Sequence, residues 1–148
     1  MDVMTTFMAY AKEFETTYVD DDWQRLERFF AADAVYEVKN VSYACRLEGT
    51  EAIFAGIKKS LDHFDRRMNT RKIDVTAPPS LEGETLSVTW AVTYTRGSAP
   101  PIRISATTTG TVRDGRIVCL CDTYDTGQEE VLRAWLDEYA PDLDPSYE

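Results

Sequence analysis

The stretch Gly115–Asp125, GRIVCLCDTYD, decides the fold and raises the question of function. It is apolar from Ile117 to Cys121, and it follows Asp114–Gly115, a dipeptide typical of two-residue β-hairpin turns. The preceding run IRISATTTGTV is therefore predicted to pair with it. Asp122 then stands where strand residues are still expected, and a carboxylate is disfavoured there unless something offsets its cost.

The neighbouring segments predict more strands. The run TLSVTWAVTYT alternates cleanly, and RKIDVTA predicts a shorter strand before it, with PPS and RGSAPP as turns. Further upstream, DAVYEVKNVSYACRLEG predicts two strands around a turn at Lys39–Asn40. The alternation places one set of side chains on the same side of the long strand: Leu86, Val88, Trp90, Val92 and Tyr94.

Apolar residues at helical spacing predict helices over residues 3–17, over about 22–31 and from Thr50 onward. A last helix follows the final strand, where Thr126–Glu129 fits a capping box. Helices, a strand pair, another helix and a long meander give an α+β order. The first three helices are predicted to cover one face of a strongly curved sheet.

Length and composition predict one soluble domain over residues 1–148, with a core at about 3–140 and a solvated acidic tail at 141–148. The 26 acidic against 16 basic residues give a formal charge of −10, which argues against nucleic acid and anionic membranes as partners. The start lacks the plan of a signal peptide, and no run is long enough to span a membrane. These features predict a cytoplasmic protein.

Three runs, WQRLERFFAADAVYEV, LEGTEAIFAGIKKSL and DGRIVCLCDTYD, carry a resemblance that spans about residues 3–140. The chain resembles the nuclear-transport-factor-2-like superfamily, and most of all its SnoaL-like branch of polyketide cyclases and limonene-epoxide-hydrolase-like proteins. The resemblance implies a cone-shaped, strongly curved antiparallel sheet of the cystatin-like type, wrapped by three N-terminal helices, with a C-terminal helix and a largely apolar cavity. This fold hosts isomerases, cyclases, hydrolases and non-catalytic binders, so function must be argued from the site.

The resemblance assigns roles residue by residue. Asp122 matches the acid/base Asp of the SnoaL-like cyclases and one Asp of the Asp-Arg-Asp relay in the epoxide hydrolases. Tyr36 matches the water-positioning Tyr of the latter, but their Asn is Val38 here, and TLSVTWAVTYT lacks the Arg and second Asp of the relay. The general base of the ketosteroid isomerases also maps to Val38, their oxyanion Tyr maps to Phe14, and their second acid has no counterpart. We therefore expect neither of these two mechanisms.

Asp122 has two interpretations at this stage. Inside an apolar cavity, loss of solvation would raise its pKa toward the range of a general acid or base. Alternatively, the strand ends there, or Asp122 forms a partly buried ion pair with Arg46 or Arg103. Strand alternation places four residues on the cavity side, namely Val118, Leu120, Asp122 and Tyr124, and four on the other side, namely Ile117, Cys119, Cys121 and Thr123.

Because both faces of this strand are apolar, the outer face is predicted to be covered. The family precedent is a homodimer that packs sheet against sheet through the convex face, and the C-terminal helix folding back is the alternative.

Further residues are predicted to contact a ligand. Tyr36 and Tyr124 can orient an oxygen, and Trp90 suits a planar ring. Arg103 is the nearest cation on the preceding strand, and His63 lies where relatives have the cavity mouth. The alternative for the aromatic residues is a core side chain whose polar atom is already hydrogen-bonded. The alternative for His63 is a solvated side chain at the end of a helix. The rest of the predicted wall is Phe14, Phe30, Val38 and Leu120.

We therefore predict a small cavity enzyme of cyclase, isomerase or hydrolase type, with no metal and no organic cofactor. It would act by acid/base chemistry on a small hydrophobic molecule that contains a ring or is polyketide-like, with Asp122 and Tyr36 as the catalytic pair. The alternative is a non-catalytic dimer of the same fold that binds a small hydrophobic ligand. A third possibility is a purely interacting dimer whose cavity is filled by its own side chains.

Overall fold

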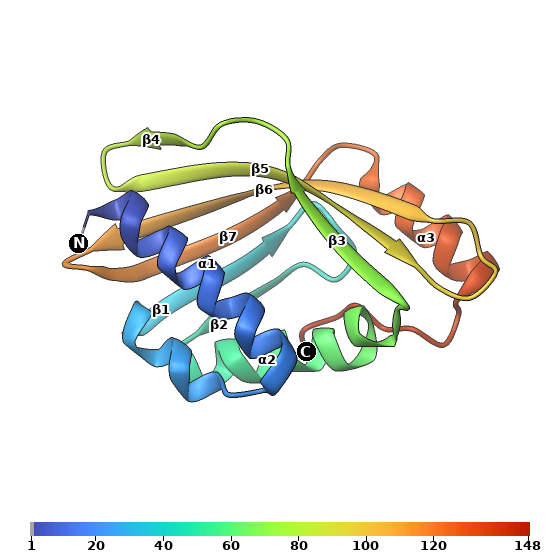
Figure 1. Ribbon diagram of the computed structural model, residues 1–148, viewed down its shortest axis with the longest axis horizontal. Coiled ribbons are helices and arrows are strands. Elements are labelled where there is room, and N and C mark those ends of the chain that lie inside the picture. The colour runs from blue at the N-terminus through green and yellow to red at the C-terminus, as the bar shows by residue number, and fades with distance from the viewer. Residues whose placement is uncertain (1) are drawn as a thin grey trace.

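Seven strands form one mixed sheet in the computed structural model, which describes residues 2–148 (Figure 1). Six of them follow the order β2-β1-β7-β6-β5-β3, and β4 pairs with β5. The strands are β1 Phe30–Lys39, β2 Cys45–Glu48, β3 Thr70–Val75, β4 Ser80–Glu82, β5 Thr85–Thr95, β6 Ile102–Arg113 and β7 Arg116–Tyr124.

One pairing corrects the prediction of an antiparallel sheet. β1 and β7 run parallel, with Tyr36 opposite Leu120 and Val38 opposite Asp122. A parallel pair needs a long connection, and here the whole segment from β2 to β6 lies between the two strands. The α+β class is confirmed, whereas the strong curvature of the sheet stays a prediction.

The helices are α1 Val3–Asp20, α2 Thr50–His63 and α3 Gln128–Tyr139, with 3-10 turns η1 Trp23–Phe29 and η2 Asp65–Arg67. The helix predicted over about 22–31 is instead the 3-10 turn η1, which ends at Phe29 because β1 begins at Phe30. No helix among residues 2–148 is long and apolar enough to cross a membrane.

The ends of two helices differ from their predictions. α1 begins where the Asp2 side chain accepts a hydrogen bond from the Thr5 amide at 2.7 Å, and it continues beyond residue 17 to Asp20. The capping box predicted for α3 does not form, because Gly127 occupies the N-cap without a side-chain hydrogen bond. Glu129 instead accepts from the Ser42 amide at 3.0 Å and so ties α3 to the β1–β2 loop.

A β-bulge in β7 changes which residues face inward. Thr111 pairs with Cys119 but Val112 pairs with Ile117, so Val118 is the extra residue. Ile117 is consequently fully buried in the same core as Leu120, whereas strand alternation placed it on the outer face. The outer face of β7 carries Cys119 and Cys121 without Ile117, and its being covered stays a prediction.

α3 packs on the same side of the sheet as α1 and α2, toward one end of β5 and β6 (Figure 1). Leu132 and Trp135 of α3 share a core with Ile102 and Ile104, whose partners on β5 face the cavity. The alternative in which this helix covers the outer face is therefore wrong. Pairing of two copies through that face stays a prediction.

The C-terminal segment 141–148 is packed, so the prediction of a solvated tail is wrong. Leu143 is buried, and the carbonyl of Pro145 accepts a hydrogen bond from the buried Ser60 hydroxyl at 2.7 Å. Gly56 of α2 makes room for this segment, because a Cβ there would lie 3.0 Å from the Tyr147 carbonyl and 2.5 Å from Leu47. Tyr147 thereby reaches the cavity wall.

α1 approaches the sheet closely where Phe7 lies over Gly110 of β6. A Cβ on Gly110 would lie 2.8 Å from two carbon atoms of the buried Phe7 ring. Gly110→Ala is therefore expected to lower the free energy of unfolding by about 1–3 kcal/mol, measured by urea denaturation. Thr109→Ala, on the outer face of the same strand, is the control, with an expected change within about 0.5 kcal/mol. Equal effects of the two substitutions would contradict the close approach of α1.

Candidate functional site

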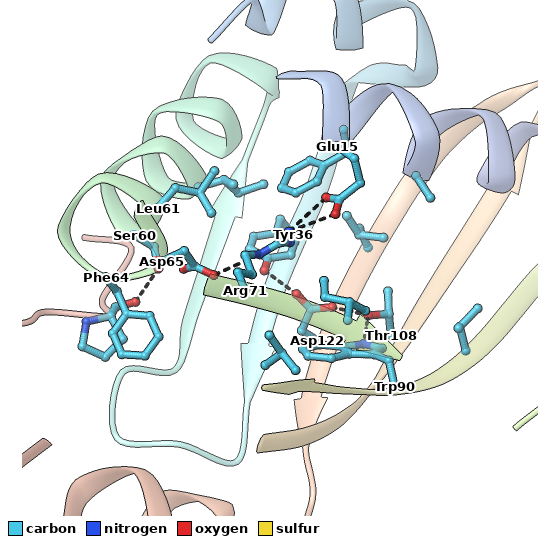
Figure 2. A pocket seen from close by; sticks show the side chains of 18 of the residues that line it. Glu15, Tyr36, Ser60, Leu61, Phe64, Asp65, Arg71, Trp90, Thr108 and Asp122 are labelled. Carbon is cyan, nitrogen blue, oxygen red and sulfur yellow. Dashed lines mark hydrogen bonds and ion pairs between the residues drawn. The ribbon is translucent and has the colours of Figure 1, made fainter. Parts of the chain in front are cut away.

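A cavity of about 440 Å³ lies between the inner face of the sheet and helices α1 and α2 (Figure 2). Its wall is mostly apolar and aromatic, and two groups of polar side chains interrupt it. One group surrounds Asp122, and the other surrounds Asp65. Pockets of this size, with a few convergent polar groups, are typical of small-molecule sites.

The carboxylate of Asp122 on β7 accepts two hydrogen bonds from neighbouring strands (Figure 2). The Tyr36 hydroxyl of β1 donates to Oδ2 at 2.6 Å, and the Thr108 hydroxyl of β6 donates to Oδ1 at 2.5 Å. Trp90 of β5 donates its indole N–H to Thr108 Oγ1 at 2.8 Å. Because an indole nitrogen can only donate, the Thr108 oxygen must accept, and its own hydrogen is directed at Asp122. The network therefore runs across four adjacent strands.

Burial raises the pKa of Asp122, and the hydrogen bonds from Thr108 and Tyr36 lower it without offsetting the loss of solvation. Burial, and then the charge of Asp122, raise the pKa of Tyr36, so its hydroxyl stays protonated and donates. The alternative of an ion pair is wrong, because Arg46 pairs with Glu48 and Arg103 lies 3.5 Å from Asp74.

A second polar cluster was not expected from the sequence. Asp65 of η2 accepts a hydrogen bond from the Tyr94 hydroxyl at 2.6 Å, and Arg71 Nε of β3 lies 3.4 Å from the same oxygen. The guanidinium also donates to Glu15 of α1 at 2.9 Å and lies over the Tyr18 ring, 4.6 Å from its centre. Burial raises the pKa of Asp65, and its hydrogen bond from Tyr94 and the charge of Arg71 oppose that shift.

Asp65 was missed because it follows the predicted helix and belongs to no motif, and Arg71 because the inward face of the predicted strand RKIDVTA was not assigned. They sit at the end of α2 and at the edge of the sheet, in a segment that looks like solvated basic surface. Their proximity arises only when β3 pairs with β5, which places Arg71 opposite Tyr94.

Six of the residues singled out from the sequence lie in the cavity wall, on α1, β1, β5 and β7. They are Phe14, Tyr36, Trp90, Leu120, Asp122 and Tyr124. Strand alternation predicted the inward direction of the β5 and β7 members correctly, and Val88, Val92 and Tyr94 line the cavity as well.

Four residues that were predicted to contact a ligand do not line the cavity. Phe30 is buried in the core against the rings of Tyr10 and Phe54, and Val38 is also sealed in that core, so neither lines the cavity. Arg103 points to the outer face of the sheet, where it is exposed beside Asp74. His63 is exposed at the end of α2 and does not line the cavity.

Three tyrosines that the sequence did not single out also line the cavity, namely Tyr10, Tyr43 and Tyr147. Tyr147 packs against Tyr36, with ring centres 5.6 Å apart, and stacks on Tyr43 at 6.3 Å. Tyr10 of α1 is buried, and its hydroxyl has no hydrogen-bond partner among residues 2–148. Burial and the charge of Asp122 raise the pKa of Tyr10, so it is a protonated donor within the field of Asp122.

No group of three or more His, Cys, Asp or Glu side chains among residues 2–148 is arranged to hold a metal ion. The chemistry that the described side chains themselves can supply is proton transfer at Asp122 and hydrogen bonding by tyrosine hydroxyls.

The fold and the cavity together define a protein of the nuclear-transport-factor-2-like class. The family model of the SnoaL-like domain matches residues 11–120, most of the chain, and the protein belongs to that family. A search of curated proteins found no match.

Solved structures of the same fold are similar over most of the chain. A putative isomerase from Bacillus subtilis has 19% identity and a TM-score of 0.67, covering 93% of this chain and 96% of that one. TerC co-crystallised with polyporic acid has 16% identity and a TM-score of 0.64, covering 92% and 98%. A hypothetical protein with a ketosteroid-isomerase-like fold from Catenulispora acidiphila, in complex with trimethylamine, has 18% identity and a TM-score of 0.58, covering 80% and 87%. At these identities the likeness establishes the fold alone.

Proposed function

We propose that this protein is a cofactor-independent enzyme that moves a proton on a small, largely apolar, ring-containing substrate, in a reaction of the isomerase or cyclase type. The observation that carries the proposal is the carboxylate of Asp122, held in an apolar cavity by Tyr36 and Thr108. TerC was co-crystallised with polyporic acid and the Catenulispora protein is in complex with trimethylamine, which supports a small molecule as the ligand.

Asp122 acts as the base in this proposal. Its ionised carboxylate takes a proton from a carbon next to a carbonyl group of the substrate, and the electron pair of the broken C–H bond moves onto the carbonyl oxygen. Tyr10, whose hydroxyl is free, donates a hydrogen bond to that oxygen as negative charge develops on it. Asp122 then returns the proton at another carbon. Alternatively, the enolate attacks a second carbonyl and closes a ring, and the alkoxide formed on that carbonyl oxygen takes the proton from Asp122.

Burial suits Asp122 to this task. A carboxylate with a raised pKa is a stronger base than one in water, and its catalytic efficiency is highest when that pKa approaches the working pH. Thr108 is oriented by Trp90 and Tyr36 is kept protonated, so both hold the carboxylate without competing for the proton. Tyr124, on the same face of β7, is proposed to contact the ring of the substrate.

The test measures proton exchange and does not require the natural substrate. Tetralone, a bicyclic aromatic ketone, is incubated with the protein in deuterated water, and loss of its α-proton signal is followed by NMR. We expect exchange faster than in buffer alone, with a rate that rises with pH as Asp122 ionises and then levels off. Naphthalene, which has no acidic C–H, should inhibit by occupying the cavity.

Two results would count against the proposal. Binding of tetralone without accelerated exchange would favour the non-catalytic ligand-binding protein of the same fold. Exchange that naphthalene does not inhibit would place the catalysis outside the cavity.

A further inference from the structure

We propose that Asp65, Arg71 and Tyr94 form a second binding subsite in the cavity, which takes a hydroxyl group at the end of the ligand remote from Asp122. This inference rests on the proposed use of the cavity as a small-molecule site, and it narrows the substrate class to uncharged molecules with a hydroxyl group at that end. Figure 2 shows the cluster in the cavity wall, toward α2, and the Asp122 network toward β6.

The cluster has unused hydrogen-bonding capacity. Tyr94 and Arg71 both approach Oδ2 of Asp65, while Oδ1 accepts no hydrogen bond from another side chain or backbone amide among residues 2–148. Arg71 uses Nη1 for Glu15, and its Nη2 donates to none of the described residues. Nη2 is not one of the buried side-chain atoms among residues 2–148 that lack a hydrogen-bond partner, so it is accessible. One acceptor and one donor are therefore free on adjacent side chains.

A hydroxyl group matches this pair, because it can donate to Asp65 and accept from Arg71 at the same time. A carboxylate would gain from Arg71 but would meet the charges of Asp65 and Glu15, which lie 3.4 Å and 2.9 Å from the guanidinium. An ammonium group would gain from Asp65 but would stand beside Arg71. Glu15 is 52% exposed, so solvent screens its charge, whereas Asp65 and Arg71 are 13% and 12% exposed and balance each other. The buried pair thus favours a neutral group that both donates and accepts.

The position of the cluster requires an elongated ligand. Tyr94 and Val88 are six residues apart on β5, and Val88 is aligned through Thr108 with Asp122. The two polar groups therefore lie at different levels of the sheet, with the apolar side chains of Trp90 and Val92 between them. A molecule that reaches both must carry its apolar rings in the middle.

The test compares four biphenyl probes, each with one para hydroxyl and with hydrogen, hydroxyl, carboxylate or aminomethyl at the other para position. Binding is measured by quenching of tryptophan fluorescence and by calorimetry. We expect the second hydroxyl to tighten binding about tenfold over hydrogen, since it forms two charge-assisted hydrogen bonds. The carboxylate and the aminomethyl group should each bind more weakly than the hydroxyl.

Substitutions test whether the tighter binding caused by the second hydroxyl depends on Asp65 and Arg71. In Asp65→Leu with Arg71→Met, which removes both charges together, the benefit of the second hydroxyl should fall below about twofold, while binding of the singly hydroxylated biphenyl is retained. Asp65→Asn, which keeps the shape of the side chain, should reduce the benefit in part. Arg103→Met, on the outer face of the same sheet, is the matched control and should leave all four affinities unchanged.

No benefit from the second hydroxyl in the wild type, or a larger benefit from either charged group, overturns the proposal. If the singly hydroxylated probe binds but the second hydroxyl adds nothing, only the subsite fails and the proposed function stands. If none of the probes binds, both the subsite and the proposed use of the cavity fail.

Discussion

Asp122→Asn is expected to slow the exchange of tetralone α-protons by about 10²–10⁴-fold, because an amide cannot accept the proton at neutral pH. The substitution keeps the shape of the side chain, so Tyr36 and Thr108 can still form hydrogen bonds with it. Affinity for tetralone should therefore change little, and the loss should appear in the rate at saturating ketone. The measurement is the same NMR experiment at several ketone concentrations.

The same variant should be at least as stable as the wild type at neutral pH. The pKa of Asp122 is raised in the folded protein, so the folded state binds more protons than the unfolded state between the two pKa values. The free energy of unfolding of the wild type consequently falls as pH rises from about 4 through the folded pKa, and below about 4 the destabilisation by the ionised carboxylate is absent. Asp122→Asn removes that slope, which urea denaturation at a series of pH values would reveal.

Asp74→Asn is the matched control, because Asp74 lies on the exposed outer face, 3.5 Å from Arg103. It should change neither exchange nor the pH dependence of stability beyond the small effect of an exposed pair. Loss of exchange of similar size in both variants, or a fully active Asp122→Asn, would remove Asp122 from the proposed mechanism.

Arg71→Met is expected to lower the free energy of unfolding by about 3–5 kcal/mol at neutral pH, because it leaves a buried carboxylate without its cation. The side chains of Arg71 and Asp65 are only 12% and 13% exposed, so solvent cannot replace the lost partner. Tyr94 alone would still donate to Asp65. The loss should shrink as pH falls, because the pKa of Asp65 is already raised and protonation relieves the unpaired charge.

Arg103→Met provides the comparison for this prediction, since its side chain is 54% exposed and its pair with Asp74 is solvated. Its expected effect is below about 1 kcal/mol. Adding Asp65→Leu to Arg71→Met should restore much of the stability, because both members of the pair are then replaced by apolar groups. A double variant less stable than the single one would show that the cluster is held by interactions other than charge.

Much of the fold follows from local pattern. The Asp114–Gly115 hairpin, the alternation of β5 and the apolar spacing of α1, α2 and α3 each reflect neighbours within a few residues, and these elements form where they were expected. The inward direction of Trp90 and Asp122 follows from the same alternation, because successive side chains of a strand point to opposite faces. The resemblance to the SnoaL-like branch also matched Asp122 and Tyr36 to catalytic residues of related enzymes.

Other features depend on contacts between distant segments. The parallel pairing of β1 with β7, which brings Tyr36 to Asp122, joins residues 86 positions apart. The bulge that turns Ile117 inward arises from the register of β6 with β7, not from the composition of either strand. The packing of residues 141–148 on α2 likewise depends on the space at Gly56, so charge alone suggested a solvated tail.

The sequence by itself determined the class of fold, the order of its elements and the presence of a carboxylate on an inward strand position, because these depend on short-range periodicity and turn chemistry. Only the tertiary structure decided the partners of that carboxylate and assembled the cluster of Asp65, Arg71 and Glu15. Those residues come from a 3-10 turn, an edge strand and the first helix, and the attraction of both carboxylates to one guanidinium brings them together at the cavity wall.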